Sequence, residues 1–123
     1  MPHRILVVDD DADVRDMLCR TLTASGYEAI PAAGGRQAVE YLTLGAPDLV
    51  ITDVVMPGVD GFEVLLKLRR MLPGARALIM SGGGRIEPEV YLDMARRLGA
   101  RCILRKPFTR AEMLDAVEQA LTP

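Results

Sequence analysis

The sequence predicts one α/β domain in which helices cover both faces of a five-stranded parallel sheet. The chain has 123 residues, of which 50% are hydrophobic and 26% are charged, the size and balance of a single globular domain with a buried core. Short runs rich in β-branched and aliphatic residues alternate five times with segments of helical periodicity. Five strands that alternate with five helices require right-handed crossover connections, which produce a doubly wound fold.

Five short apolar runs are the expected strands. The first, third and fourth are apolar enough to be buried on both faces, which is typical of central strands in a parallel sheet. The runs are 4–8 (RILVV), 27–32 (YEAIPA), 48–52 (DLVIT), 76–80 (RALIM) and 101–105 (RCILR).

The first helix is expected at 12–25. Asp11 precedes it as the N-cap, where its carboxylate would accept a hydrogen bond from a backbone N–H of the first turn. Gly26 follows as the C-terminal stop. The apolar face that would pack on the sheet consists of Val14, Met17, Leu18, Thr21 and Leu22.

Capping and stop signals delimit the other four helices. The third opens with a capping box of Asp60 and Glu63, and the fifth with one of Thr109 and Glu112. Glycine or Pro-Gly follows the second, third and fourth. The expected ranges are 36–44, 61–72, 87–98 and 110–121.

The composition excludes several classes of protein. No run of about 18 apolar residues is present and the first residues do not form a signal peptide, so we expect a soluble, cytoplasmic protein that does not contact a membrane. Cys19 and Cys102 lack the spacing of metal ligands, and we expect free thiols, buried or half-buried. Aromatic residues make up only 4% of the chain, which argues against direct binding of single-stranded nucleic acid.

The net charge of −2 conceals an asymmetry. Residues 1–60 contain ten acids and four bases, whereas residues 61–123 contain seven acids and eleven bases. Seven of these bases fall between Arg85 and Arg110. This pattern favours either a partner-binding face or a scattered, solvated surface.

Polar residues follow four of the five expected strands. Asp9 and Asp10 end the first strand, Asp53 the third, Ser81 the fourth, and Lys106 the fifth. In a doubly wound sheet, ligands bind outside the carboxyl ends of the strands, so we expect these side chains to converge at one edge.

Clustered carboxylates at this edge predict a bound cation. Carboxylates repel one another unless a cation neutralises them, and an all-oxygen site suits Mg²⁺. We expect Asp10 and Asp53 to bind Mg²⁺ and Asp9 to hold a coordinated water, which leaves coordination positions for a phosphoryl group. Lys106 would supply a compact positive charge, and Ser81 a hydrogen bond to a phosphoryl oxygen. Asp53 is then the candidate nucleophile that forms an aspartyl phosphate.

Four blocks of the sequence resemble those of the receiver domains of bacterial two-component response regulators. The blocks are ILVVDDDADVR, PDLVITDVVMPGVDGFEVL, IMSGGG and LRKPF, in the family's order and spacing, and the resemblance covers essentially the whole chain, 1–123. It implies a flavodoxin-like fold with strand order 2-1-3-4-5. It also implies a phosphorylation-activated switch that receives its phosphoryl group from a histidine kinase or phosphotransfer protein.

The resemblance also implies a role for each residue at the edge. Asp53 would be the phosphoacceptor, Asp9 and Asp10 the acidic pair, Ser81 the switch hydroxyl and Lys106 the phosphate-sensing lysine. Such a domain catalyses its own phosphorylation and dephosphorylation, although it acts mainly as a switch. Two backbone features would complete the site, namely the carbonyl of Val55 as a Mg²⁺ ligand and a cis peptide between Lys106 and Pro107.

The sequence departs from the family pattern at the switch and tuning positions. Ile103 stands where many members carry an aromatic switch residue, and it cannot swing as an aromatic ring does. Val55 and Gly83 occupy two positions that tend to tune dephosphorylation, and both lack polar side chains. We therefore expect a fairly long-lived phosphorylated state.

Alternative functions remain open at this point. The chain is expected to be either a free-standing switch or the receiver part of a longer regulator, and a phosphorylation-independent interaction module is a further alternative. A phosphohydrolase would normally carry a second carboxylate two residues after the nucleophile, where Val55 stands. The output face would comprise the fourth helix, fifth strand and fifth helix, and would bind an acidic partner or a second copy of the chain.

Overall fold

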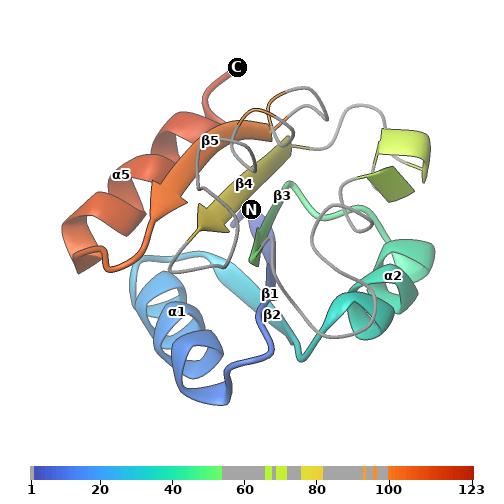
Figure 1. Cartoon of the computed structure of the whole chain (residues 1–123), viewed down its shortest axis with the longest axis horizontal. Helices are drawn as coiled ribbons and strands as arrows, with labels where there is room; N and C mark the ends of the chain where they lie inside the picture. The colour runs from blue at the N-terminus through green and yellow to red at the C-terminus, as the bar shows by residue number, and fades with distance from the viewer. Residues whose placement is uncertain are drawn as a thin grey trace.

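The sheet follows the predicted topology. The computed structural model describes residues 2–53, 66–67, 69–71, 76–81, 93, 96 and 100–123, with the backbone alone at 81. All neighbouring strands are parallel, and their order is β2-β1-β3-β4-β5, as expected (Figure 1). The strands are β1 (Arg4–Val8), β2 (Glu28–Ala32), β3 (Leu49–Asp53), β4 (Arg76–Ser81) and β5 (Ala100–Arg105).

Central position in the sheet explains the most apolar strands. β1, β3 and β4 each have a neighbouring strand on both sides, so the side chains between their end residues lose contact with water. The segments 5–8, 49–52 and 77–80 are accordingly buried. The three strands expected to be buried on both faces are thus confirmed.

Helices α1 (Ala12–Ala24), α2 (Gly35–Leu44) and α5 (Arg110–Leu121) begin and end close to the predicted positions. Asp11 caps α1, where its side chain accepts from the backbone N–H groups of Asp13 and Val14. Gly26 has a φ of 93°, the left-handed conformation that glycine adopts readily after a helix. Thr109 and Glu112 form the expected capping box of α5.

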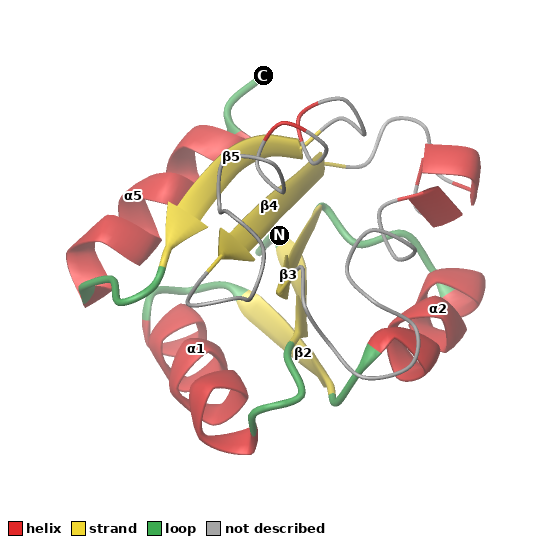
Figure 2. Cartoon of the chain, in the orientation of Figure 1, coloured by secondary structure: helices red, strands yellow, loops and turns green. Residues whose placement is uncertain are grey.

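The helices divide the core into two layers. Figure 2 shows α1 and α5 on one face of the sheet and α2 on the other. Alternate residues of each strand face opposite layers because the side-chain period of a strand is two. One layer joins the helical residues Leu18, Leu22, Met113 and Val117 to the strand residues Ile5, Val7, Leu49, Ile51, Leu78, Met80 and Leu104. The other joins Ala38 and Leu42 of α2 to Leu6, Val8, Ala32, Val50, Ala77 and Ile79.

Some expectations need correction, and others fall outside the described residues. Met17, placed on the apolar face of the first helix, is 42% exposed, because the buried stripe of α1 runs through Leu18 and Leu22. Asp53 ends β3, as expected. Within the third and fourth expected helices, residues 66–67, 69–71, 93 and 96 are helical, but the capping box of Asp60 and Glu63 lies outside the described residues.

Among the helices in the described ranges, none is long and apolar enough to cross a membrane.

Candidate functional site

The alternation of side chains along three strands brings Asp9, Asp53 and Lys106 to one place. Each lies two positions beyond a buried residue that faces α1 and α5, so each side chain emerges on that side of the sheet at its carboxyl edge. The three buried residues are Val7, Ile51 and Leu104. The predicted convergence therefore follows from strand register and period alone.

Lys106 bridges the two carboxylates. Its Nζ donates to Oδ2 of Asp53 at 2.7 Å and to Oδ2 of Asp9 at 3.1 Å. The side chains of Lys106, Asp53 and Asp9 are 25%, 14% and 1% exposed, so both contacts lie largely out of water. Charge-assisted hydrogen bonds of this length are the stronger kind in proteins.

Burial dominates the electrostatics of Asp9. Desolvation raises the pKa of its carboxyl above the ordinary value, and it outweighs the opposing effects of the Asp11 backbone N–H and the Lys106 ammonium. The Asp11 N–H donates to Asp9 Oδ1 at 2.9 Å. For Lys106, burial by itself lowers the pKa, but hydrogen bonds and charge attraction to Asp53 and Asp9 together raise it above its ordinary value. Among the side-chain ion pairs of the described residues, one ammonium thus serves both carboxylates, so acids outnumber bases within this cluster.

Asp10 lies beside this cluster without joining its contacts. Its side chain is exposed, and within the described parts of the chain no three His, Cys, Asp or Glu residues form a group that could hold a metal ion. Mg²⁺, however, needs only one or two protein carboxylates, because it keeps several waters and binds substrate phosphate. The excess negative charge of Asp9 and Asp53, with Asp10 next in the chain, fits such an ion.

The backbone of Ser81 lies at the same edge of the sheet. In the parallel register, Asp53 is the partner of Met80, and Ser81 is the partner of Arg105, the residue before Lys106. Ser81 is thus one residue beyond the partner of Asp53. Its side chain, together with the whole of Val55 and Gly83, lies outside the described part of the structure.

The remaining predicted positions are described. The Lys106–Pro107 peptide is cis, as the resemblance implied. Ile103 is half-buried and packs on the α2 side of the sheet, the face opposite the charged cluster. Cys19 and Cys102 are half-buried free thiols, as expected.

Two residues that no sequence pattern marks hold the backbone of the site. Arg15 of α1 donates from Nη1 to the main-chain oxygen of Asp9 at 2.8 Å. Thr52, which is fully buried, donates from Oγ1 to the main-chain oxygen of Asp53 at 3.0 Å. In the sequence, Arg15 looks like an ordinary solvated helix residue and Thr52 like an ordinary β-branched strand residue. Only their proximity to the acidic positions could have drawn attention to them.

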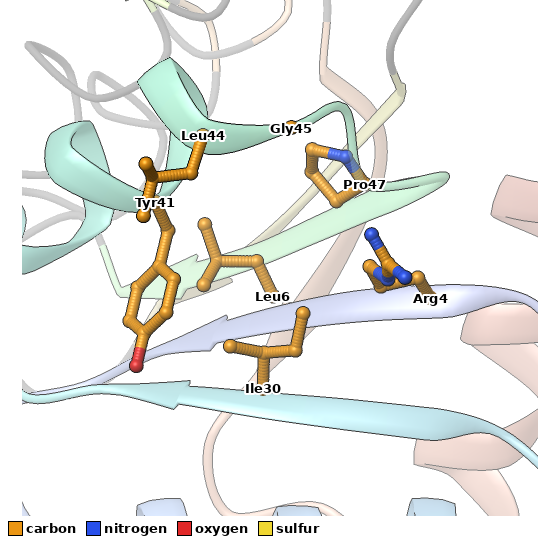
Figure 3. Close-up of a pocket in the computed structure, with 7 residues that line it drawn as sticks. All are labelled: Arg4, Leu6, Ile30, Tyr41, Leu44, Gly45 and Pro47. Atoms are coloured by element: carbon orange, nitrogen blue, oxygen red, sulfur yellow. The ribbon is translucent and has the colours of Figure 1, made fainter.

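A small apolar hollow lies at the other end of the sheet. Figure 3 shows its lining side chains, contributed by β1, β2, α2 and the segment that follows α2. Apart from Arg4 they carry no charge, and none belongs to the cluster of Asp9, Asp53 and Lys106. The lining residues are Arg4, Leu6, Ile30, Tyr41, Leu44, Gly45 and Pro47.

Comparison with known families and proteins agrees with this arrangement. Residues 5–118 match the response regulator receiver domain. Among curated proteins, sporulation initiation phosphotransferase F of Bacillus subtilis is 35% identical over 121 residues, which cover 98% of this chain and 95% of that protein. Response regulator MprA of Mycolicibacterium vanbaalenii is 40% identical over 122 residues, which cover 98% of this chain but 51% of that protein.

Among solved structures, chemotaxis protein CheY4 of Vibrio cholerae superposes with a TM-score of 0.88 at 30% sequence identity. The match covers 98% of this chain and 100% of that one. The relatives thus include proteins of about this length and one of about twice this length.

Proposed function

The chain belongs to the response regulator receiver domain family, and from this premise we propose that it is a phosphorylation-activated switch whose phosphoacceptor is Asp53. Membership places it in two-component signalling. The observation that carries the proposal is the bridge from Lys106 Nζ to the carboxylates of Asp53 and Asp9, with all three side chains largely withdrawn from water.

The proposed step is transfer of a phosphoryl group from a phosphohistidine of the donor protein. A carboxylate oxygen of Asp53 forms a bond to phosphorus while the bond between phosphorus and the donor nitrogen breaks, and the donor histidine is restored. Lys106, which is at 2.7 Å from Asp53 before the reaction, then neutralises part of the charge on the new phosphoryl group. Positioning and charge neutralisation are most of what this chemistry requires.

Asp9, Asp10 and Asp53 would hold Mg²⁺, with the Val55 carbonyl as a further ligand. Bound there, the ion would neutralise the developing phosphoryl charge. Asp9 is already fixed through both carboxylate oxygens, by Lys106 and by the Asp11 N–H. Preorganised acids of this kind support a metal site that need not rearrange when the ion binds.

Phosphorylation would be read out through Ser81 and Lys106. Ser81 ends β4 and is the register partner of Arg105 in β5, and Lys106 lies between β5 and α5, so a change at either residue would reach β5 and α5. Ile103 is half-buried on the other face of β5 and has no aromatic ring to swing, so shifts of the backbone would transmit the change instead. We propose that this region binds an output protein with an acidic surface, or a second copy of the chain. The basic residues of the region are Arg96, Arg97, Arg101, Arg105 and Arg110.

The donor would be a histidine kinase or a phosphotransfer protein in the cytoplasm. The relatives of similar length favour a free-standing switch, whereas MprA, of which this chain spans about half, favours a receiver within a longer regulator. A phosphorylation-independent interaction module is the runner-up, and the intact charged cluster argues against it.

The first experiment is phosphorylation with a small phosphodonor. The protein would be incubated with acetyl phosphate and Mg²⁺, and its intact mass followed against time. Asp53→Asn removes the acceptor. Asp16→Asn is the matched control, because Asp16 is an exposed aspartate on α1, 3.8 Å from Arg20.

We expect one phosphoryl adduct on the wild type and on Asp16→Asn, and none on Asp53→Asn or with the metal chelated. Folded protein that never gains an adduct would instead support the interaction module. An adduct on Asp53→Asn would show that the acceptor is another residue.

The lifetime of the adduct tests the tuning positions. Since neither Val55 nor Gly83 has a polar side chain to orient an attacking water, we expect slow loss of the phosphoryl group. Val55→Asn should hasten that loss, because its amide can hold a water near phosphorus. Decay of the adduct mass after removal of the donor measures this, and an unchanged rate in the variant contradicts the explanation.

A further inference from the structure

Asp9 is held at four points, and one of them comes from a charged side chain outside the cluster of Asp9, Asp53 and Lys106. Its backbone N–H donates to the Ala32 oxygen at 3.2 Å. Its two carboxylate oxygens accept from the Asp11 N–H and from Lys106. The fourth contact is the bond from Arg15 Nη1 to its main-chain oxygen, 2.8 Å long.

The position of Arg15 on α1 explains how it reaches this carbonyl. It is the fourth residue of the helix, and long helical side chains point back toward the N-terminus. The side chain therefore extends over the first turn to a residue six positions earlier, and it is half-buried there. This contact joins the first turn of α1 directly to the residue that follows β1.

The contact also brings positive charge to the most acidic segment of the chain. Four aspartates, at positions 9, 10, 11 and 13, lie between the end of β1 and the first turn of α1. A guanidinium bonded to the Asp9 carbonyl reduces their mutual repulsion without occupying either carboxylate oxygen of Asp9. Both oxygens of Asp9 keep their own partners, and the exposed carboxylate of Asp10 follows at a fixed backbone position.

We propose that Arg15 is a positioning residue for the acidic pair. By fixing the main chain at Asp9, it orients the carboxylates of Asp9 and Asp10 for Mg²⁺, and through them it supports phosphorylation of Asp53. Arg15 touches neither the metal nor the phosphoryl group. This inference rests on the proposed function for its phosphorylation arm, whereas its Mg²⁺-binding arm can be tested without a phosphodonor.

The test uses a matched pair of variants on one helix. Arg15→Met keeps the apolar stem but removes the donor and the charge. Arg20→Met removes the same charge from α1 at an exposed position, where the side chain is 84% exposed and lies 3.8 Å from Asp16. Arg15→Lys keeps the charge and one donor, and it serves as the conservative variant.

Two readouts are needed. The Mg²⁺ dissociation constant is measured by titration followed through amide chemical shifts, without phosphodonor. The phosphorylation rate with acetyl phosphate is measured over a range of Mg²⁺ concentrations, so that weak metal binding and a slow transfer step can be separated. Far-UV circular dichroism and urea unfolding show that each variant is folded.

We expect Arg15→Met to weaken Mg²⁺ binding by about tenfold, the effect typical of losing a partner that orients a metal ligand. Arg15→Lys should recover most of that loss, and Arg20→Met should stay within about twofold of the wild type, since exposed charges contribute little. At low Mg²⁺, phosphorylation of Arg15→Met should slow in proportion.

Wild-type Mg²⁺ affinity in folded Arg15→Met, or an equal loss in Arg20→Met, would overturn the inference. If the wild type binds Mg²⁺ but takes up no phosphoryl group, while Arg15→Met still binds Mg²⁺ more weakly, the proposed function fails and the positioning role stands. If Arg15→Met does not fold, Arg15→Gln decides, because its shorter, uncharged side chain cannot reach the Asp9 carbonyl, and wild-type Mg²⁺ affinity in that folded variant would overturn the inference.

Discussion

The two ends of the sheet contain the same kinds of charged group in different surroundings. At the amino end, Arg4 Nε lies 3.6 Å from Glu28 Oε2, and the side chains are 48% and 52% exposed. At the carboxyl end, Lys106 lies 2.7 Å from Asp53, and those side chains are 25% and 14% exposed. The first pair is balanced and solvated, whereas the second is shorter, drier and shared with Asp9.

The difference shows that burial and charge balance, more than residue type, decide whether an ion pair contributes to stability or forms a site for a further charged group. Water screens the amino-end pair, so it contributes little to stability. At the carboxyl end, the charges have lost much of their hydration, and two acids compete for one base. Such a cluster lowers the stability of the folded chain. It is also the arrangement of charges that a divalent cation or a phosphoryl group would bind. Substitutions at each end can test this contrast.

Removal of the shared base should have the largest effect. Lys106→Met would leave Asp9 and Asp53 without their ammonium partner, and we expect a loss of roughly 2–3 kcal/mol in the free energy of unfolding at pH 7, somewhat below the cost of breaking a fully buried pair. Urea denaturation without Mg²⁺ measures this.

The pH dependence identifies the cause of that loss. The folded-state pKa of Lys106 is raised above its ordinary value of 10.5, so its stabilisation is fully present below 10.5 and is lost as the pH rises through the folded value. The difference in unfolding free energy between the wild type and Lys106→Met should therefore narrow as the pH rises above the folded pKa of Lys106. It should also narrow in acid, where the carboxylates are protonated. A gap independent of pH would point to lost packing of the lysine stem.

Removal of the buried acid should have a smaller effect of the opposite sign. Asp9→Asn leaves Lys106 paired with Asp53 alone, which balances the cluster. We expect a gain of about 1 kcal/mol in unfolding free energy at pH 7, because the neutral amide avoids the cost of burying a second negative charge beside Asp53. Urea denaturation over a series of pH values measures the gain. We also expect the variant to bind Mg²⁺ more weakly, which titration of the folded protein measures.

The sign of this pH dependence follows from the raised pKa of Asp9. Its carboxyl binds a proton more readily in the folded than in the unfolded chain, whose value is 3.8. Stability therefore falls as the pH rises from 3.8 through the folded pKa of Asp9. In Asp9→Asn this fall should be reduced. If the variant is instead less stable than wild type at every pH, the Asp9 contacts outweigh its burial cost, and the charge-imbalance interpretation is wrong.

The sequence predicted the carboxyl end much better than the amino end. Periodicity located the five strands, and the rule that ligands bind beyond the carboxyl ends of parallel strands selected Asp9, Asp53 and Lys106 before any distance was known. Cap signals at Asp11 and Thr109 fixed two helix starts, because they act within one turn of the chain. These signals are local or depend only on topology.

The residues that sequence reasoning missed act through tertiary contacts. Arg15 and Thr52 bind main-chain carbonyls, and any donor of suitable length can do so, hence no residue pattern marks them. Met17 is exposed because the buried stripe of α1 runs through Leu18 and Leu22, and helical periodicity alone does not specify the edges of that stripe. The amino-end pair of Arg4 and Glu28 likewise arises from the register of β1 and β2, in which these two residues are direct partners.

That amino-end pair should show the smallest effect. Arg4→Met keeps the stem beside the apolar hollow and leaves the backbone N–H of Arg4 free to donate to Asp48, as it does at 2.7 Å. We expect the unfolding free energy to change by no more than about 0.5 kcal/mol, and the change to shrink further as salt is added, because exposed pairs are screened. Urea denaturation at low and high ionic strength measures both. A loss as large as that of Lys106→Met would mean that exposure does not distinguish the two ends, and the asymmetry between them would then have to come from geometry alone.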